Sequence, residues 1–212
     1  YESLETTHAS VMDAMGNAVS YTTTLNLSYG TKIVAAGTGM LLNNEMDDFS
    51  AKENAPNFYG LIGRRANSIE PGKRMLSSMT PTIVRKDGKP ILVTGSPGGS
   101  TIITTTMQVI LNVIEHKMSL SDAVSSPRFH HQWLPTRVMH ERFAFSPDTR
   151  RSLQSRGHNE LVPLPPRYAL GDANSVMQGE KGIEGMADPR NAGAAVGAAL
   201  VAPLVESQAA TK

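Results

Sequence analysis

Two adjacent threonines near the start of the chain, Thr6 and Thr7, are the residues best suited to nucleophilic chemistry. A threonine at a chain terminus carries its own base, because its hydroxyl attacks while its free α-amine accepts the proton. That amine titrates at roughly 7.7–8.0 when unperturbed, so much of it is neutral near physiological pH. While Thr6 is bonded to Glu5, its nitrogen is an amide and cannot serve as this base. A terminal nucleophile here therefore requires cleavage of the chain, and the residues alone do not choose between Thr6 and Thr7.

A glycine pair, Gly98 and Gly99, lies between a strand-like segment at residues 90–94 and a helical pattern over residues 101–116. Glycine lets the backbone turn its N–H groups toward a ligand, and the helix N-terminus that follows favours negative charge. The loop lacks the Lys-Ser/Thr ending of a P-loop and the spacing of a dinucleotide fingerprint. Beside a threonine nucleophile it predicts an oxyanion hole, the alternative being an ordinary strand-to-helix turn.

Two polar clusters separate the threonines from the glycine loop. The first, residues 43–48, holds three acids and two amides, which suit an ammonium ligand or a hard cation. The acid pattern and central glycine of an EF-hand are absent, so calcium is not expected. The second cluster, Ser77 and Ser78, could hydrogen-bond a carboxylate. The alternatives are a solvated turn for the first cluster and serines that only satisfy loop backbone for the second.

His130 and His131 are adjacent, and neighbouring positions on an extended segment point to opposite faces. We therefore expect structural histidines, with Trp133 packed against them, and no metal site. A serine triad lacks the G-x-S-x-G elbow that would support it. The chain has no cysteine, which excludes disulfides and thiolate chemistry within it.

The 212 residues suffice for one domain with a substantial core. A net charge of +1, with 18% charged residues, gives no electrostatic case for a nucleic-acid partner. No apolar stretch reaches the length of a membrane span, so no membrane partner is expected. Residues 1–5 show neither the basic nor the apolar region of a signal peptide. Composition therefore leaves the compartment open.

Alternation and turn residues predict the elements that must position these groups. In chain order they are a hairpin at 9–13 and 18–25, a hairpin at 81–85 and 90–94, a helix at 101–116, a short helix capped by Ser119 and Asp122, a helix from Ser146 to Gly157, and strands at 175–177 and before Asp188. One face of the long helix is apolar, with Ile103, Met107, Ile110, Leu111 and Ile114. Residues 27–80 are expected to form long ordered loops around short elements. Strand pairs followed by helices favour a layered α+β domain.

Seven segments, in one order and over about residues 6–190, resemble the small subunit of the γ-glutamyltranspeptidases, glutathione hydrolases of the N-terminal nucleophile superfamily. They are residues 6–11, 16–20, 41–50, 76–82, 95–99, 127–135 and 188–190. In that family a precursor cleaves itself, and the new terminal threonine of the small subunit is the nucleophile. The resemblance thus implies Thr6 as nucleophile and Glu5–Thr6 as the scissile bond. It also implies a four-layer αββα sandwich, with this chain supplying the active-site half.

The resemblance divides the chain into three parts. Residues 1–5 correspond to the end of the large subunit or propeptide, residues 6–190 to the small-subunit catalytic domain, and residues 191–212 to a tail without an assigned role. The implied partner is the large subunit from the same precursor, which holds the arginine that the family uses for the donor α-carboxylate. No cofactor and no metal are implied.

Matching positions carry over the roles that complete the reaction centre. Thr24 corresponds to a threonine that hydrogen-bonds the nucleophile. Gly98 and Gly99 correspond to the oxyanion hole, and Ser77 and Ser78 to the positions that bind the donor α-carboxylate.

The donor α-ammonium group is implied to bind Asn26, Glu45 and Asp48, and nearby negative charge makes this electrostatically sensible. Glu45 stands where several bacterial relatives have Gln. Residues 53–64 resemble the lid loop of many bacterial members, in which Tyr59 would cover the bound glutamyl group.

The implied activity is γ-glutamyl transfer and glutathione hydrolysis, in which a γ-glutamyl-threonine ester passes to water or to an amino acid or dipeptide acceptor. The bacterial type of lid favours a periplasmic or secreted enzyme. Alternatives are a glutaryl-cephalosporin acylase, a poly-γ-glutamate transpeptidase, or an inactive binding-only relative. Two acids at the ammonium site argue against an acylase, whose glutaryl group has no α-amine. The intact Thr6, Thr24 and glycine pair argue against an inactive relative.

Overall fold

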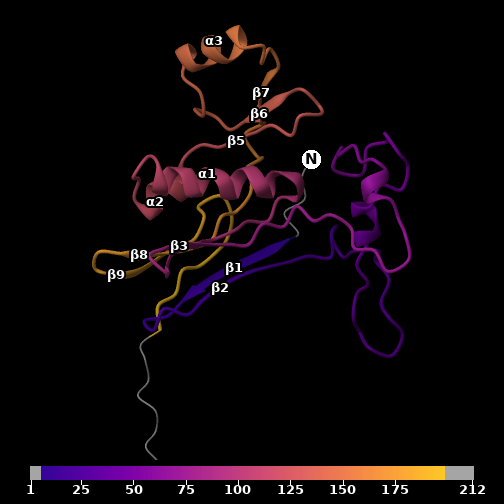
Figure 1. Ribbon diagram of the computed structural model, residues 1–212, viewed down its shortest axis with the longest axis horizontal. Coiled ribbons are helices and arrows are strands. Elements are labelled where there is room, and N and C mark those ends of the chain that lie inside the picture. The colour runs from indigo at the N-terminus through magenta and orange to yellow at the C-terminus, as the bar shows by residue number, and fades with distance from the viewer. Residues whose placement is uncertain (1–5, 199–212) are drawn as a thin grey trace, which may run out of the picture.

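The computed structural model describes residues 6–198, whose main body is built of three stacked layers (Figure 1). Two helices, α1 (Ile102–Ile114) and α2 (Leu120–Ser125), cover one face of a four-stranded sheet, and a two-stranded sheet covers its other face. The expected α+β class is therefore confirmed. Residues 1–5, with the Glu5 side of the expected cleavage bond, and residues 199–212 of the expected tail lie outside the described residues.

The two-stranded sheet is a hairpin of β1 (Thr7–Met12) and β2 (Ala18–Thr23). The strands are antiparallel, with Thr7 opposite Thr23. Side chains alternate between the faces, so His8 is buried against the larger sheet while Val11, Val19 and Tyr21 on the outer face stay more than half exposed. This hairpin was predicted from sequence, with ends within two residues of those observed.

The four-stranded sheet is antiparallel in the order β3-β4-β8-β9. Its strands are β3 (Thr82–Lys86), β4 (Lys89–Thr94), β8 (Ser175–Gly179) and β9 (Gly182–Met186). Both of its hairpins match predicted strands, and they join where Leu92 pairs with Met177 and Val93 with Val176. This pairing brings the glycine loop after β4 beside the segment that leads into β8.

The core lies between the larger sheet and its two helices. Its buried members are Leu92, Val109, Leu120, Val124 and Ala173. Burying an aliphatic side chain of this size stabilises a fold by about 1.5–3 kcal/mol. The core therefore holds α1 firmly over β4, and with it the glycine loop that connects them.

Helix α1 turns to the sheet a face that only partly overlaps the apolar stripe seen in the sequence, of which Ile110 packs against the core. The residues that it buries are Ile102, Thr105, Thr106, Gln108 and Val109. Ile103, Met107 and Leu111 of the predicted stripe are 40–51% exposed. Both sides of this helix carry apolar or β-branched residues, so periodicity located an apolar face without showing what covers it.

A smaller lobe lies beyond α1 (Figure 1). It contains β5 (Phe129–His130), β6 (Val138–His140), α3 (Pro147–Ser155) and β7 (Leu161–Pro163). Ser146 caps α3 as predicted, since its hydroxyl accepts from the backbone N–H of Thr149 at 3.1 Å. Ser119 caps α2 in the same way through Asp122, also at 3.1 Å.

A buried ion-pair network ties this lobe to the segment that follows β9. Arg128 donates to Asp188 at 2.6 Å, with both side chains almost inaccessible. Arg190 lies 3.0 Å from Asp188 and 2.7 Å from Glu141. Because these residues are far apart in sequence, the network fixes how distant segments meet.

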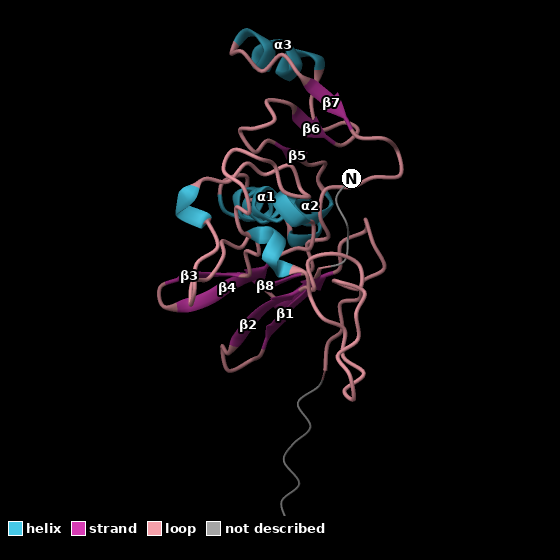
Figure 2. Cartoon of the chain, turned by 90° about the vertical axis from the view of Figure 1, so that its right-hand side faces the viewer, coloured by secondary structure: helices cyan, strands magenta, loops and turns pink. Residues whose placement is uncertain are grey.

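Residues 24–81 form ordered loops with two short 3-10 helices, η1 (Glu45–Asp48) and η2 (Arg65–Asn67), as expected for this stretch. Figure 2 looks toward these loops, with the two sheets and α1 behind them. No helix within residues 6–198 is long and apolar enough to cross a lipid bilayer.

Candidate active site

Thr6 lies directly before β1 and is 7% exposed. Its hydroxyl donates to Thr24 Oγ1 at 3.1 Å, and Thr24 lies directly after β2. The hairpin register explains this contact, because Thr7 opposite Thr23 brings the next residues on each strand together. Thr7, by contrast, points to the exposed face. The fold thus separates the two threonines that sequence reasoning alone left equivalent.

Asn26 connects this pair to the loops. Its backbone N–H donates to Thr24 Oγ1 at 2.9 Å, and its amide donates to Asn44 O at 3.2 Å. Its φ of 73° is left-handed, a conformation that asparagine tolerates better than most residues with a Cβ. Tyr59 donates its hydroxyl proton to Asn26 O at 2.8 Å. One buried asparagine therefore joins the threonine pair, the acidic loop and the tyrosine.

Glu45 and Asp48 lie on η1, where a spacing of three residues puts both on one side of a 3-10 turn. Burial raises the pKa of Glu45 to about 7, and the neighbouring Asp48 carboxylate and a hydrogen bond with it add to that rise. Burial also raises the pKa of Asp48, although the hydrogen bond from Glu45 opposes this. Glu45 Oε1 is buried without a hydrogen-bond partner among the described residues. Such an orphaned acceptor suits an incoming ammonium group.

Ser77 and Ser78 line a cavity of about 560 Å³ together with Asp48 and Ser100. Ser77 Oγ accepts from the backbone N–H of Met79 at 3.2 Å, so one of its hydrogen bonds already stabilises the loop. Ser77 is exposed and Ser78 half-buried. The serines therefore face open space beside the acidic turn, with hydroxyl protons available to a carboxylate.

Sequence reasoning missed Asn67, which joins the two polar clusters. Its amide donates to Asp48 O at 2.7 Å, and its Oδ1 accepts from the backbone N–H of Leu76, next to Ser77, at 3.0 Å. One side chain thereby sets the distance between the acidic turn and the serines. Only its position in an Asn-rich loop could have drawn attention to it.

Gly98 and Gly99 have φ angles of 131° and 54°, and both are buried. The Gly98 carbonyl accepts from the N–H of Thr101 at 3.0 Å and from its hydroxyl at 2.8 Å, which closes the turn. A Cβ on Gly99 would come within 2.6 Å of the Tyr59 ring. The expected lid tyrosine therefore lies directly against the glycine loop.

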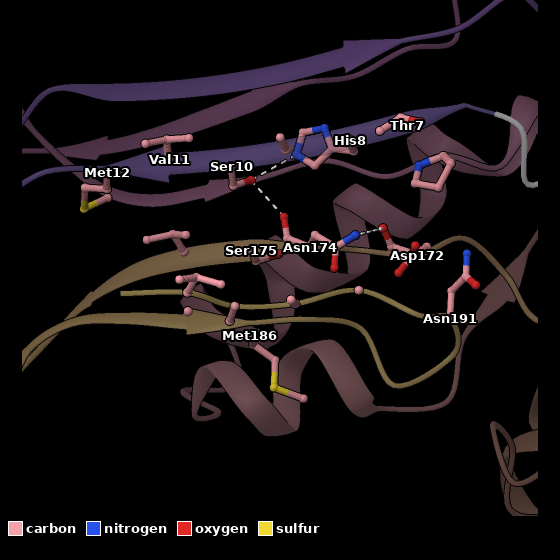
Figure 3. Close-up of a pocket in the computed structure, with 18 of the residues that line it drawn as sticks. Thr7, His8, Ser10, Val11, Met12, Asp172, Asn174, Ser175, Met186 and Asn191 are labelled. Atoms are coloured by element: carbon pink, nitrogen blue, oxygen red, sulfur yellow. Dashed lines mark hydrogen bonds between the residues drawn. The ribbon is translucent and has the colours of Figure 1, made fainter. Parts of the chain in front are cut away.

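A second cavity, of about 600 Å³, opens between β1 and the segment before β8 (Figure 3). Thr6, His8, Pro97, Asp172 and Asn174 are among its lining residues. One carboxylate oxygen of Asp172 is buried without a hydrogen-bond partner in the described part of the chain, and burial raises the pKa of this residue. Because Thr6 is one of the lining residues, it borders open space on this side of β1.

His130 and His131 were expected to be structural, and the structure gives their surroundings. His130 is buried, with ring nitrogens 2.7 Å from Thr104 Oγ1 and 2.8 Å from Gln132 Oε1. Trp133 was expected to pack against the histidines; it lines the same cavity as they do but is 65% exposed, and its φ of 70° is left-handed. Residues 6–198 hold no cluster of three or more groups able to bind a metal ion.

With this geometry established, comparison with known proteins gives the family. The sequence profile described as gamma-glutamyltranspeptidase matches residues 1–198. The chain belongs to the γ-glutamyltranspeptidase family.

Two curated relatives are identical to the chain at about half of the aligned positions. It is 53% identical over 192 residues to the glutathione hydrolase proenzyme of Escherichia coli, covering 90% of this chain. It is 50% identical over 204 residues to the glutathione hydrolase proenzyme of a Pseudomonas species, covering 93% of this chain. The alignments cover 32% and 36% of those relatives, so the chain spans about a third of their length.

Solved γ-glutamyltranspeptidases share the fold as well. A crystal structure of a Helicobacter pylori γ-glutamyltranspeptidase variant is 52% identical and superposes with a TM-score of 0.80. The match covers 87% of this chain and all of the chain in that structure. The expected fold type, the sandwich of the N-terminal nucleophile hydrolases, is therefore confirmed. Of its layers, residues 6–198 supply one helical layer and two sheets.

Proposed function

We propose that this chain is the small subunit of a γ-glutamyltransferase that also hydrolyses glutathione. The observation that carries the proposal is the buried hydroxyl of Thr6, hydrogen-bonded to Thr24 at 3.1 Å, in a chain of this family. Cleavage of the Glu5–Thr6 bond makes Thr6 terminal and frees its α-amine to act as base. The relatives are named proenzymes, which supports such a maturation step.

The donor binds through its α-amino acid end. Glu45 and Asp48, with Asn26 beside them, hold the α-ammonium group, since the two carboxyls face each other across one turn. Ser77 and Ser78 hold the α-carboxylate from the adjoining cavity. Asn67 keeps the two clusters at a fixed separation through its bonds to Asp48 and Leu76. An arginine of the large subunit completes the carboxylate site.

The reaction then proceeds by acyl transfer through Thr6. The hydroxyl oxygen attacks the γ-glutamyl carbonyl carbon while its proton passes to the α-amine of Thr6. The N–H groups of Gly98 and Gly99 stabilise the oxyanion of the tetrahedral intermediate, and the departing amine takes the proton as the C–N bond breaks. Water or an amino acid or dipeptide acceptor next attacks the γ-glutamyl-threonine ester, and the threonine hydroxyl is regenerated.

Tyr59 covers the site during the acyl-transfer reaction. Its ring lies against Gly99 and its hydroxyl is bonded to Asn26, so it bridges the oxyanion loop and the ammonium site. A cover in this place keeps bulk water from the ester until an acceptor arrives. The segment at residues 53–64 thus serves as the lid.

The large subunit from the same precursor is the partner. Two exposed apolar faces of the described chain need a cover, namely the outer face of β1 and β2 and the stripe of α1 that includes Met107 and Leu111. The relatives are about three times longer than the matched region, which leaves enough chain to cover both. We assign residues 6–190 to the catalytic subunit, residues 1–5 to the end of its partner, and residues 191–212 to a tail. An exported, periplasmic or secreted, location fits this family.

Substrate choice tests the proposal directly. The mature heterodimer should hydrolyse a γ-glutamyl anilide and discriminate strongly against the glutaryl anilide, which lacks the α-ammonium group. Losing a charged hydrogen-bonded group at a buried site costs about 1.5–3 kcal/mol, or roughly a tenfold to hundredfold loss of kcat/KM. A preference for the glutaryl compound would indicate an acylase and contradict the proposal.

A further inference from the structure

His8 lies two residues beyond Thr6, on the face of β1 that packs against the larger sheet. It is 6% exposed, and its ring lies directly over Gly95. A Cβ at Gly95 would come within 2.3 Å of His8 Cε1. Gly95 is not among the residues with positive φ. Glycine is therefore required at position 95 by the imidazole ring and not by the backbone conformation.

Hydrogen bonds fix the orientation of this ring (Figure 3). His8 Nδ1 lies 2.7 Å from Thr22 Oγ1, and Nε2 lies 3.0 Å from Ser10 Oγ. Ser10 uses its one hydroxyl proton to donate to Asn174 O at 2.8 Å, so toward the ring it can only accept. Nε2 therefore carries the imidazole proton, and Nδ1 accepts from Thr22. The neutral ring is tied to β2 on one side and, through Ser10, to the segment before β8 on the other.

We propose that His8 and Gly95 form a positioning pair that sets the separation between the nucleophile and the oxyanion loop. Thr6 precedes His8 by two residues of extended chain, about 6–7 Å, and Gly98 follows Gly95 by three residues. The ring stacked on the glycine is thus a contact, close to both groups in sequence, that holds the strand of Thr6 against the strand that leads into the glycine loop. A shift of about 1 Å between reacting groups can cost a hundredfold in rate. A change in the spacing between the His8 ring and Gly95 should therefore change turnover. The inference rests on the proposed function of Thr6.

A double-mutant cycle in the full-length precursor tests the pair. Gly95→Ala places a methyl group against the ring and should lower kcat by about tenfold to a hundredfold. KM for a γ-glutamyl anilide should change by less than about threefold, because the donor-binding loops are not touched. His8→Ala removes the ring and should also lower kcat. In the double variant the added methyl enters the space left by the ring, so kcat should recover by about fivefold or more over Gly95→Ala alone.

Gly185→Ala on β9 is the matched control, because it makes the same change in the sheet that Gly95 directly follows, at a position where the new Cβ would meet only Ala195 Cβ at 3.2 Å. It should retain nearly wild-type kcat. A Gly95→Ala enzyme with wild-type kcat would overturn the proposal, as would losses that simply multiply in the double variant. If Gly95→Ala yields no folded enzyme, the double variant decides, since recovery of soluble active protein supports the pair and no recovery overturns it.

Thermal unfolding of the wild type, the two single variants and the double variant needs no turnover, so it separates this inference from the proposed function. The pair predicts that Gly95→Ala lowers the unfolding temperature and that adding His8→Ala restores part of it. A wild-type enzyme without γ-glutamyl hydrolysis would contradict the proposed function, while the unfolding temperatures would still support or overturn the contact.

Discussion

The hydroxyl of Thr6 donates a 3.1 Å hydrogen bond to the hydroxyl oxygen of Thr24, across the open end of the β1–β2 hairpin. The bond orients the Thr6 hydroxyl before any substrate is present. It also gives Thr24 a definite role, because Thr24 Oγ1 accepts from Asn26 N–H as well. One hydroxyl group therefore orients both the proposed nucleophile, Thr6, and Asn26 of the proposed ammonium site.

Thr24→Ala should separate catalysis from donor binding. The change removes the acceptor for both Thr6 and Asn26, and a lost buried hydrogen bond costs about 1–3 kcal/mol. We expect kcat to fall by roughly tenfold to a hundredfold with a smaller change in KM, measured by steady-state hydrolysis of a γ-glutamyl anilide. Thr24→Ser keeps the hydroxyl and should stay near wild type. Equal activity of the alanine and serine variants would contradict this role.

Donor affinity should weaken as the pH falls through 7. Burial and the neighbouring Asp48 raise the pKa of Glu45 to about 7, so below that pH Glu45 becomes neutral and loses its attraction for an ammonium group. KM for the donor should therefore rise toward acid pH. Glu45→Gln is neutral at every pH and should flatten this part of the kcat/KM profile, leaving the titration of the Thr6 amine. An unchanged acid limb in the Gln variant would count against a charged role for Glu45.

Tyr59→Phe should loosen the lid without removing it. The phenyl ring still lies against Gly99, but the 2.8 Å bond to Asn26 O is lost. A hydrogen bond of this kind contributes about 1 kcal/mol, so KM for the donor should rise about fivefold with kcat less affected. Tyr29→Phe, at a 69% exposed tyrosine, is the control and should change neither constant.

Asp188→Asn should destabilise the small subunit strongly. Asp188 accepts from Arg128 at 2.6 Å and from the backbone N–H of Ala173 at 2.7 Å, and the Arg128 charge is almost inaccessible to water. Removing one partner of a buried pair costs about 3–5 kcal/mol, because the other charge is left uncompensated. Chemical denaturation should show this loss, whereas Asp148→Asn, which breaks an exposed pair with Arg151, should cost less than about 1 kcal/mol.

His8 should make stability depend on pH in the acid range. Burial lowers the pKa of His8 from 6.5 to about 4, so the unfolded chain binds a proton more readily than the folded one between these values. The stabilisation is therefore complete above pH 6.5 and is lost as the pH falls toward 4, by roughly 2–3 kcal/mol. Denaturation measured across this range should show a shallower slope for His8→Gln than for wild type. His116→Gln, at an exposed site, should leave the slope unchanged.

Local patterns predicted most of the elements that position the site. The first hairpin, the caps at Ser119 and Ser146, and the strand before the glycine loop all depend on neighbours within a few residues. Such features are set by backbone geometry and short-range hydrogen bonds. They could be located without knowing how the layers stack.

Contacts between distant segments could not be predicted in this way. Gly95 is explained only by the ring of His8, and Asn67 only by its bonds to Asp48 and Leu76. Met107 was predicted to lie on an apolar face, yet its side chain stays 42% exposed, while Ile110 of the same face packs against the core. In each case the residue type has several local explanations, and long-range packing selects among them.

The intact mass of the purified full-length product tests the central claim most directly. We expect a small fragment that begins at Thr6 and that gains the mass of one γ-glutamyl group after brief exposure to a donor. Thr7→Ala should cleave and label in the same way, while Thr6→Ala should do neither. A fragment beginning at Thr7, or full amidase activity in the Thr6→Ala protein, would contradict Thr6 as the nucleophile.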